Sequence, residues 1–235
     1  MLRRLGPRLV IYSSLAIAFL LWRPYHDAYL RYGIITFGIA LWLGLIMTVW
    51  KRHLAWRIAA FSLPLLLAIP FLLPSRELDR PRLQARYLET LRSYDGTRYV
   101  WGGESRRGID CSGLPRAALR SALAEQALEG NGRAARLWLE QWWFDTSAKA
   151  MSEEYRTFTR STGLTGDMRE IDPSQIAPGD LAVTDDRRHV MMHLGNGEWI
   201  QAEPNVGKVF IARAGSPHSH YPASEVTLHR WRVLE

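Results

Sequence analysis

Three apolar stretches follow one another in the first 75 residues, separated by short polar turns. Residues 33–50 hold 18 positions without a charge, and residues 54–73 are interrupted only by Arg57. A membrane-spanning helix needs about 20 predominantly apolar residues, so both stretches predict spans. Residues 9–22 have only 14 uncharged positions, and their pattern also fits a signal peptide. No small-x-small cleavage site follows them, which favours a retained third span.

From residue 76 onward, the pattern of hydrophobic and polar positions is that of a soluble domain. A polar linker, residues 76–83, leads into segments with helical spacing. A glycine-rich loop over residues 99–113 and the run Gly130-Asn131-Gly132 interrupt these segments. The pattern predicts helices over residues 83–94, 117–128, 134–143 and 147–159. Short alternating runs then predict a strand meander over residues 181–184, 189–194, 198–202, 209–212 and 226–233.

The order of these elements predicts the fold class. Helices that come first and strands that follow are typical of an α+β domain with helices packed on an antiparallel sheet. We therefore expect a transmembrane helical anchor over residues 1–75 and a soluble domain over residues 76–235. The second part is long enough for one domain with its own hydrophobic core.

The charge distribution argues against a nucleic-acid-binding surface. The first 75 residues hold eight Lys or Arg and one acid, which accounts for the whole net charge of +7, and the remaining 22 basic and 22 acidic residues balance. The adjacent Arg106 and Arg107 are too few for a phosphate-binding patch. Basic residues flank the apolar segments at the N-terminus and at Lys51 and Arg52. They predict that the N-terminus and the loop at Lys51 lie on the cytoplasmic side. This topology puts residue 76 and everything after it outside the cytoplasm.

Cys111 is the single cysteine of the chain, which excludes internal disulfides and multi-cysteine metal sites. Free cysteines are commonly small buried hydrophobic residues. Here the neighbours Asp110, Ser112 and Gly113 are polar or small, and a loop runs into a predicted helix. Because a helix N-terminus favours the thiolate, we expect Cys111 to be a nucleophile with an imidazole partner.

Two histidines of one predicted strand are candidates for that partner. Alternation places His189, Met191 and His193 on one face of the strand, and Val190 and its alternate neighbours on the other. Four strand residues span about 13 Å, so only one histidine can pair with Cys111. The pattern itself leaves both possibilities open.

Several short motifs together resemble the NlpC-type cell-wall cysteine peptidases. They are YVWGG at residues 99–103, GIDCSGL at 108–114, PGDL at 178–181, HVMMHLGNG at 189–197 and IQA at 200–202. The resemblance covers roughly residues 84–235. It implies a papain-like domain in which the cysteine heads a helix packed on an antiparallel sheet. It also implies cleavage of amide bonds in peptidoglycan stem peptides, without a cofactor.

The resemblance assigns roles residue by residue. Cys111 matches the nucleophile and His189 the base, whereas His193 falls where the family usually has an aromatic residue and is expected to be structural. Gln201 matches the third polar residue, which orients the histidine. The remaining assignments are Tyr99 for stabilising the oxyanion and Asp110, Ser112 and Gly103 for binding the substrate.

The chain departs from the family pattern in three places. Pro115 stands inside the predicted helix, where it removes a backbone hydrogen bond near the helix start. Residues 130–170 are expected to be a helical insertion that adds core, with a substrate-binding lid as the alternative. A multi-helix anchor replaces the usual signal peptide and wall-binding modules. His218 and His220 have no obvious third ligand, so no metal site is expected.

These observations predict a cysteine hydrolase anchored in the cytoplasmic membrane. Its expected partners are peptidoglycan peptides and the lipid bilayer, and the sequence does not identify a membrane-protein partner. Two alternatives are open. The same triad can act on lipid or protein amides, or the domain can be an inactive module that binds wall peptides or forms a scaffold.

The role of Gln201 depends on the loop at Gly195-Asn196-Gly197. A simple two-residue turn would pair Met192 with Gln201 and place Gln201 on the face opposite to His189. We therefore expect a loop of odd length or a bulge if Gln201 is to reach His189.

Overall fold

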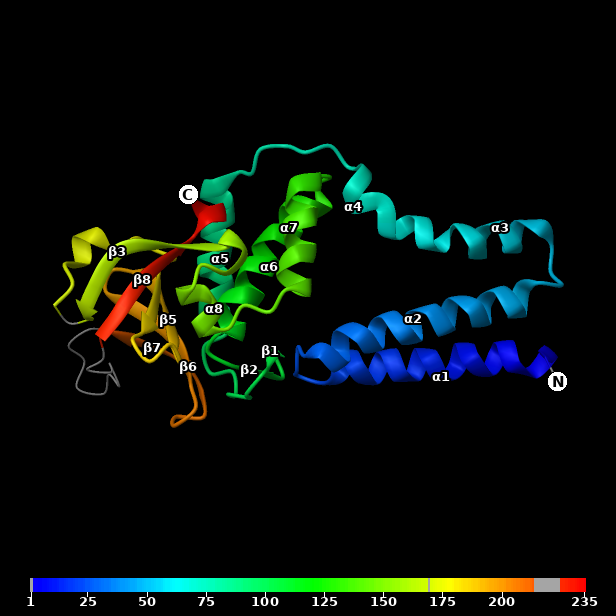
Figure 1. Ribbon diagram of the computed structural model, residues 1–235, viewed down its shortest axis with the longest axis horizontal. Helices are drawn as coiled ribbons and strands as arrows, with labels where there is room; N and C mark the ends of the chain where they lie inside the picture. The colour runs from blue at the N-terminus through cyan, green and yellow to red at the C-terminus, as the bar shows by residue number, and fades with distance from the viewer. Residues whose placement is uncertain (1, 169, 214–224) are drawn as a thin grey trace. The chain divides into compact units, whose positions relative to one another are not determined.

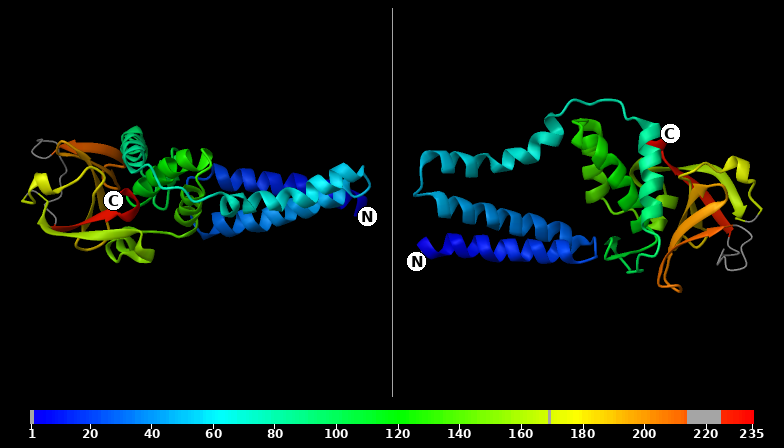
Figure 2. Two further views of the ribbon diagram at one scale, coloured as in Figure 1. Left: turned by 90° about the horizontal axis from the view of Figure 1, so that it is seen from above. Right: turned by 180° about the vertical axis from the view of Figure 1, so that it is seen from behind.

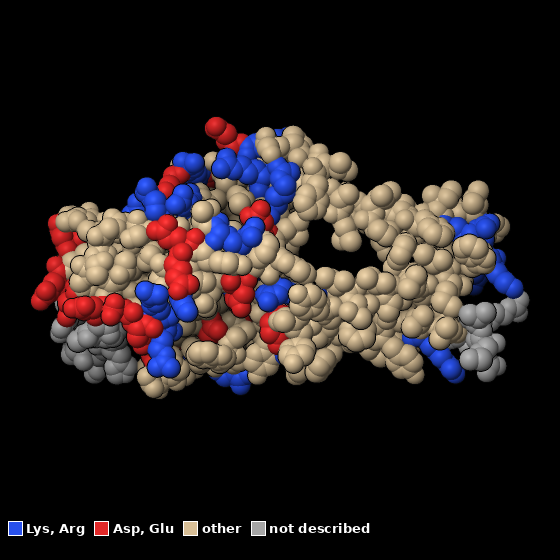
Figure 3. All heavy atoms as spheres, in the orientation of Figure 1, with Lys and Arg blue, Asp and Glu red and all other residues tan. Residues whose placement is uncertain are grey.

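The computed structural model describes residues 2–168, 170–213 and 225–235 and divides into two compact units, Met1–Leu73 and Pro74–Glu235. Each unit is described by itself. On the face drawn in Figure 3, charged side chains gather over the second unit, whereas mostly uncharged side chains cover the first.

The first unit consists of helices only (Figure 1). These are α1 (Leu2–Trp22), α2 (Ala28–Val49), α3 (Leu54–Ser62), the 3-10 helix η1 (Leu63–Ala68) and α4 (Ile69–Leu72). Among the described residues, three segments are long and apolar enough to span a membrane, namely Leu5–Trp22, Ala28–Val49 and Leu54–Leu72. The third is not one regular α-helix, because new helical segments begin at Leu63 and Ile69, with Pro64 and Pro70 in their first turns.

Small residues let α1 and α2 pack closely. A Cβ atom added to Gly44 would lie 2.9 Å from Cβ of Leu9 and 3.0 Å from the carbonyl oxygen of Gly6. A larger side chain at position 44 would therefore force the two helices apart. Asp27 caps α2 by accepting a hydrogen bond from the backbone N–H of Leu30 at 2.8 Å.

The second unit packs helices on an antiparallel sheet, which confirms the α+β class. Its long helices are α5 (Arg80–Ser93), α6 (Gly113–Leu128) and α7 (Gly132–Trp143), which lie side by side against the sheet (Figures 1 and 2). A short helix α8 (Ala148–Ser152) and a two-stranded ribbon of β1 (Glu104–Ser105) and β2 (Gly108–Ile109) complete this layer. Side-chain caps begin three of the helices: Asp79 for α5, Asn131 for α7 and Ser147 for α8.

The main sheet has six strands in the order β3-β8-β4-β5-β6-β7. They are β3 (Thr159–Asp167), β4 (Leu181–Thr184), β5 (Val190–Gly195), β6 (Glu198–Glu203), β7 (Lys208–Arg213) and β8 (Glu225–Trp231). Alternate residues enter different cores: Val190 and Met192 join the cluster that includes α5 and α6, whereas Met191 joins a second cluster with Trp199.

Three expectations about this unit are corrected. The helix expected over residues 147–159 is replaced by the short α8 and the 3-10 helix η2 (Tyr155–Thr157), and the expected helical insertion of residues 130–170 ends in a strand, β3. The sheet is also not a simple meander, because β8 lies between β3 and β4. The strand β3 carries polar and glycine residues and is half-exposed, so its sequence lacks the apolar alternation that identifies strands.

Candidate active site

The glycine-rich loop of residues 96–113 lies along the edge strand β7. The N–H of Gly96 donates to the carbonyl of Val209 at 3.0 Å, and the N–H of Tyr99 donates to Gly207 at 2.8 Å. These bonds satisfy the open edge of the sheet. They also hold the loop that carries Cys111 against the sheet that carries the histidine.

Asp110 fixes the shape of this loop through its carboxylate. Oδ2 accepts a hydrogen bond from the N–H of Gly102 at 2.7 Å, and Oδ1 accepts one from the N–H of Gly113 at 2.6 Å. The hydroxyl of Ser112 also donates to Oδ1, at 3.1 Å. Burial raises the pKa of Asp110, and the N–H donors of Gly113 and Gly102 oppose this shift. The Asp110 carboxylate thus joins the two halves of the loop. This structural role is separate from its expected role in binding substrate.

Two glycines of the loop are required by close packing. A Cβ atom on Gly113 would lie 2.2 Å from the carbonyl oxygen of Gly103, and a Cβ atom on Gly103 would lie 2.5 Å from that of Gly108. No side chain fits at either position without a backbone shift. Gly103 therefore has a structural reason to be glycine, independent of any contact with substrate.

A buried ion cluster, which the sequence analysis missed, attaches the loop to α6. The carboxylate of Glu104 lies 2.5 Å from the guanidinium groups of both Arg116 and Arg120. The Glu104 side chain is only 4% exposed. Since removing one partner from a buried ion pair leaves an uncompensated charge, this cluster constrains the residues just beyond Gly103. The spacing of the two arginines by four residues on a helix is the signal that was available.

Cys111 is buried, and its environment favours the neutral thiol. The thiol lies 3.8 Å from the carbonyl oxygen of Arg188. Burial, followed by the charge of Asp110, raises the pKa of Cys111 to about 12, although the N–H groups of Val190 and Ser112 favour the thiolate. The helix start was expected to favour the thiolate, but α6 begins two residues later, at Gly113, and burial dominates. Pro115 lies in the first turn of α6, where backbone N–H groups lack helical acceptors.

His189 immediately precedes β5 and is held by its backbone. Its N–H donates to the hydroxyl oxygen of Thr184 at 3.1 Å, and its carbonyl accepts from the N–H of Thr184 at 3.1 Å. Its Nε2 lies 2.7 Å from Oε1 of Gln201, which is almost completely buried. Because an amide oxygen only accepts, this contact puts a proton on Nε2, so Nδ1 is the ring nitrogen that can act as a base.

A β-bulge makes the contact between His189 and Gln201 possible. The hairpin has a two-residue turn, in which Asn196 and Gly197 both take positive φ and Gly195 pairs with Glu198. The register then shifts, so that His193 pairs with Trp199 and Met192 with Ile200. Leu194 is the extra residue, and the expected need for a bulge is confirmed.

His193 lies apart from these contacts. It is buried, its Nδ1 is 3.2 Å from the carbonyl oxygen of Ala177, and its ring centroid is 4.9 Å from that of Trp199. Burial lowers the pKa of His193. Of the two histidines, the structure therefore brings His189 to Gln201 and places His193 in the second core cluster.

Tyr99 and Glu203 complete the surroundings of these groups. The pKa of Tyr99 is raised by burial and then by the charges of Cys111, Asp110 and Glu203. Oε2 of Glu203 lies 3.7 Å from Nε2 of His189. The sequence motifs do not include Glu203; the available signal is its spacing of two residues from Gln201 on one strand.

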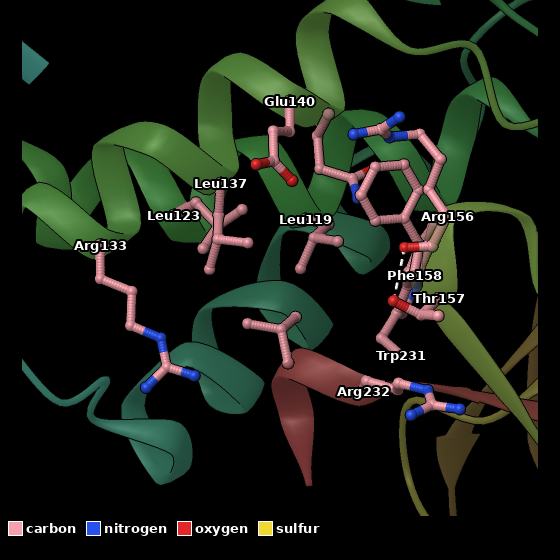
Figure 4. Close-up of a pocket in the computed structure, with 12 residues that line it drawn as sticks. Leu119, Leu123, Arg133, Leu137, Glu140, Arg156, Thr157, Phe158, Trp231 and Arg232 are labelled. Carbon is pink, nitrogen blue, oxygen red and sulfur yellow. Dashed lines mark hydrogen bonds between the residues drawn. The ribbon is translucent and has the colours of Figure 1, made fainter. Parts of the chain in front are cut away.

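The described residues show no metal site at this group of side chains, and the cavity between α6, α7 and β8 lies elsewhere in the unit. Among the described residues, no group of three or more His, Cys, Asp and Glu side chains is placed to hold a metal ion. His218 and His220 lie outside the described residues. A cavity of about 270 Å³ lies between α6, α7, the segment 155–158 and β8 (Figure 4). Leu119, Leu137, Glu140 and Trp231 are among its lining residues, and none of the expected site residues is.

Comparison with known proteins gives one family. A model described as the NlpC/P60 family matches residues 96–230, more than half of the chain. None of the curated proteins compared with the chain matches it.

Solved structures are similar at low identity. A P60 domain of an antigen from M. avium subspecies paratuberculosis is 21% identical, with a TM-score of 0.41, over 67% of this chain and 99% of that one. NlpC2 from Trichomonas vaginalis is 22% identical, with a TM-score of 0.41, over 66% of this chain and 49% of that one. The peptidoglycan hydrolase RipB from Mycobacterium tuberculosis is 20% identical, with a TM-score of 0.42, over 80% and 89%.

Proposed function

The chain belongs to the NlpC/P60 family, and from that premise we propose that it is a membrane-anchored cysteine hydrolase that cleaves amide bonds in peptidoglycan stem peptides. Cys111 is the nucleophile, His189 the base and Gln201 the residue that orients the base. One observation carries this proposal, the 2.7 Å contact between Nε2 of His189 and Oε1 of Gln201. In this proposal Nδ1, rather than Nε2, is the nitrogen that accepts the thiol proton.

The reaction begins from a neutral thiol. Nδ1 of His189 takes the proton from Sγ of Cys111 while Sγ attacks the amide carbonyl carbon. The backbone N–H of Cys111 and the hydroxyl of Tyr99 stabilise the oxyanion. The imidazolium then gives its proton to the leaving amine as the C–N bond breaks. Water, deprotonated by His189, hydrolyses the thioester and regenerates the thiol.

The loop beside Cys111 binds the substrate peptide in this proposal. Ser112 and Gly103 flank the nucleophile, so a peptide bond that reaches Sγ passes next to them. Asp110 acts mainly by holding the N–H groups of Gly102 and Gly113 in place. Its contribution to binding is therefore to keep the loop in the shape that the peptide meets.

The apolar helices anchor the enzyme in the cytoplasmic membrane, with the hydrolase on the outer side. The support is the excess of basic residues at the N-terminus and around Lys51, which are retained on the cytoplasmic side of membranes. A reporter enzyme that works only outside the cytoplasm should be active when fused after Glu235 and silent when inserted after Lys51. The reverse pattern would contradict both the topology and access to the wall.

Digestion of purified peptidoglycan tests the activity itself. Full-length protein in detergent is incubated with peptidoglycan, and the soluble products are analysed by mass spectrometry. We expect stem-peptide fragments that carry one added water at a single amide bond, and none with Cys111→Ala at an equal unfolding temperature. Intact muropeptides with both proteins, or equal cleavage by both, would refute the proposal. Cleavage of a lipid or protein amide instead would favour the alternative substrate class.

A further inference from the structure

The carboxylate of Glu203 lies beside the histidine on the side opposite to its free nitrogen. Glu203 is the last residue of β6, two positions after Gln201, so both side chains leave the strand on the same face. Its Oε2 is 3.7 Å from Nε2 of His189, too long for a hydrogen bond but close for an interaction between charges.

The position of this carboxylate is fixed by the turn that follows. Oε1 of Glu203 accepts hydrogen bonds from the backbone N–H of Asn205 at 3.1 Å and from its side-chain amide at 2.9 Å. With Oε1 held in this way, Oε2 is the oxygen that faces His189. The side chains of Glu203 and His189 are 19% and 16% exposed, so water screens their interaction only partly.

We propose that Glu203 is a positioning residue that strengthens His189 as a base, an inference that rests on the proposed function. Gln201 is neutral and fixes the tautomer, but it contributes no charge to the imidazolium that forms when His189 takes the thiol proton. Glu203 supplies that negative charge. Orientation and electrostatic stabilisation of the base are thus divided between two neighbouring side chains of β6.

Other ionisable groups face the same histidine or the same carboxylate. Asp186 lies in the turn before His189, but its carboxylate accepts hydrogen bonds from the Thr184 hydroxyl and from the N–H of Arg188. Those two donors are the leading causes that lower the pKa of Asp186. Arg188 precedes His189 in the chain, and its carbonyl oxygen lies 3.8 Å from the thiol of Cys111. Lys208 pairs with Glu203 in the register of β6 and β7.

The test measures alkylation of Cys111 by iodoacetamide in full-length protein between pH 5 and pH 9. Cys111 is the only cysteine, so the site of reaction is unambiguous. Glu203→Gln keeps the size and the acceptor for Asn205 but removes the charge. We expect Glu203→Gln to lower the alkylation rate about 10-fold at pH 7.5. The acid limb of the pH–rate profile should also move to lower pH, because a weaker base protonates at lower pH. Glu203→Asp should restore most of the rate.

Glu198→Gln is the matched control. Glu198 lies at the other end of β6 and is paired with Arg92, so its neutralisation should change neither the rate nor the acid limb. A Glu203→Gln profile identical to wild type would overturn the proposal. So would a lower rate with an unmoved acid limb, which indicates a merely structural role. Because alkylation uses no peptidoglycan, this result is independent of whether the wall is the substrate.

Discussion

The loop that carries Cys111 and the hairpin that carries His189 prepare their side chains in opposite ways. The loop depends on many contacts: the Asp110 carboxylate, two glycines and an ion cluster at Glu104 hold it against α6 and the sheet. The strands of the hairpin are buried over most of their length, and their register depends on a single bulge at Leu194. The loop raises the pKa of the thiol, whereas the hairpin leaves one imidazole nitrogen free.

This difference assigns separate tasks to the two regions. The loop determines where the sulfur and the oxyanion-stabilising groups lie, but it favours the neutral thiol. Activation of the sulfur must then come from the hairpin. A change in the loop should therefore remove structure and activity together, whereas a change in the hairpin should weaken the base and leave the fold in place.

The largest expected effect comes from Gly113→Ala in the loop. Its Cβ would lie 2.2 Å from the carbonyl oxygen of Gly103, and backbone cannot yield as a flexible side chain does. We expect activity to fall to background and the unfolding free energy to fall by about 3 kcal/mol or more. Thermal unfolding and peptidoglycan digestion measure the two effects.

Gly38→Ala is the matched control for that change. A Cβ on Gly38 meets nothing within 4 Å, and alanine is a better helix former than glycine. This variant should keep wild-type activity and stability. If Gly113→Ala is also tolerated, the close packing of Gly113 against Gly103 is not what positions Cys111.

A smaller effect is expected from Gln201→Ala in the hairpin. Loss of the acceptor at 2.7 Å frees the tautomer and ring orientation of His189, so turnover should fall about 10–100-fold. More activity should remain than with Cys111→Ala, and Cys111 should stay in place. Turnover equal to wild type would exclude Gln201 from the triad, and loss equal to that of Cys111→Ala would contradict the division of tasks.

The smallest effect concerns His193, which lies on β5 but outside the proposed triad. Burial lowers its pKa in the folded state below the ordinary value of 6.5, so the unfolded chain takes up the proton first as the pH falls. Stability linked to His193 is therefore present above about pH 6.5 and lost below it. His193→Gln should reduce the acid-induced drop in unfolding temperature by a few degrees at most. An unchanged drop would show that His193 does not titrate on unfolding.

The sequence predicted the features that rest on local pattern. The motifs around Gly103 and Cys111, the helix after them and five of the strands follow from glycine placement and from apolar periodicity. The strand β3 could not be predicted, because it depends on pairing with β8 far along the chain. The spacing of Arg116 and Arg120 hinted at an ion cluster, but not that Glu104 would be its buried partner. The contact between Glu203 and His189 depends on the bulge in the hairpin. The sequence indicated that a bulge was required, but not that it would lie at Leu194.

The most direct test of the central claim, a neutral thiol activated by His189, is the pH profile of Cys111 alkylation in wild type and His189→Ala. With a thiol pKa of about 12, His189→Ala should show a rate that rises continuously to at least pH 10. At pH 8 it should react about 50–100-fold more slowly than an ordinary thiol of pKa about 8.5, even allowing for the greater nucleophilicity of a more basic thiolate. Wild type should instead reach a plateau near neutral pH. Coincident profiles, or a midpoint near pH 8.5 in His189→Ala, would contradict the account.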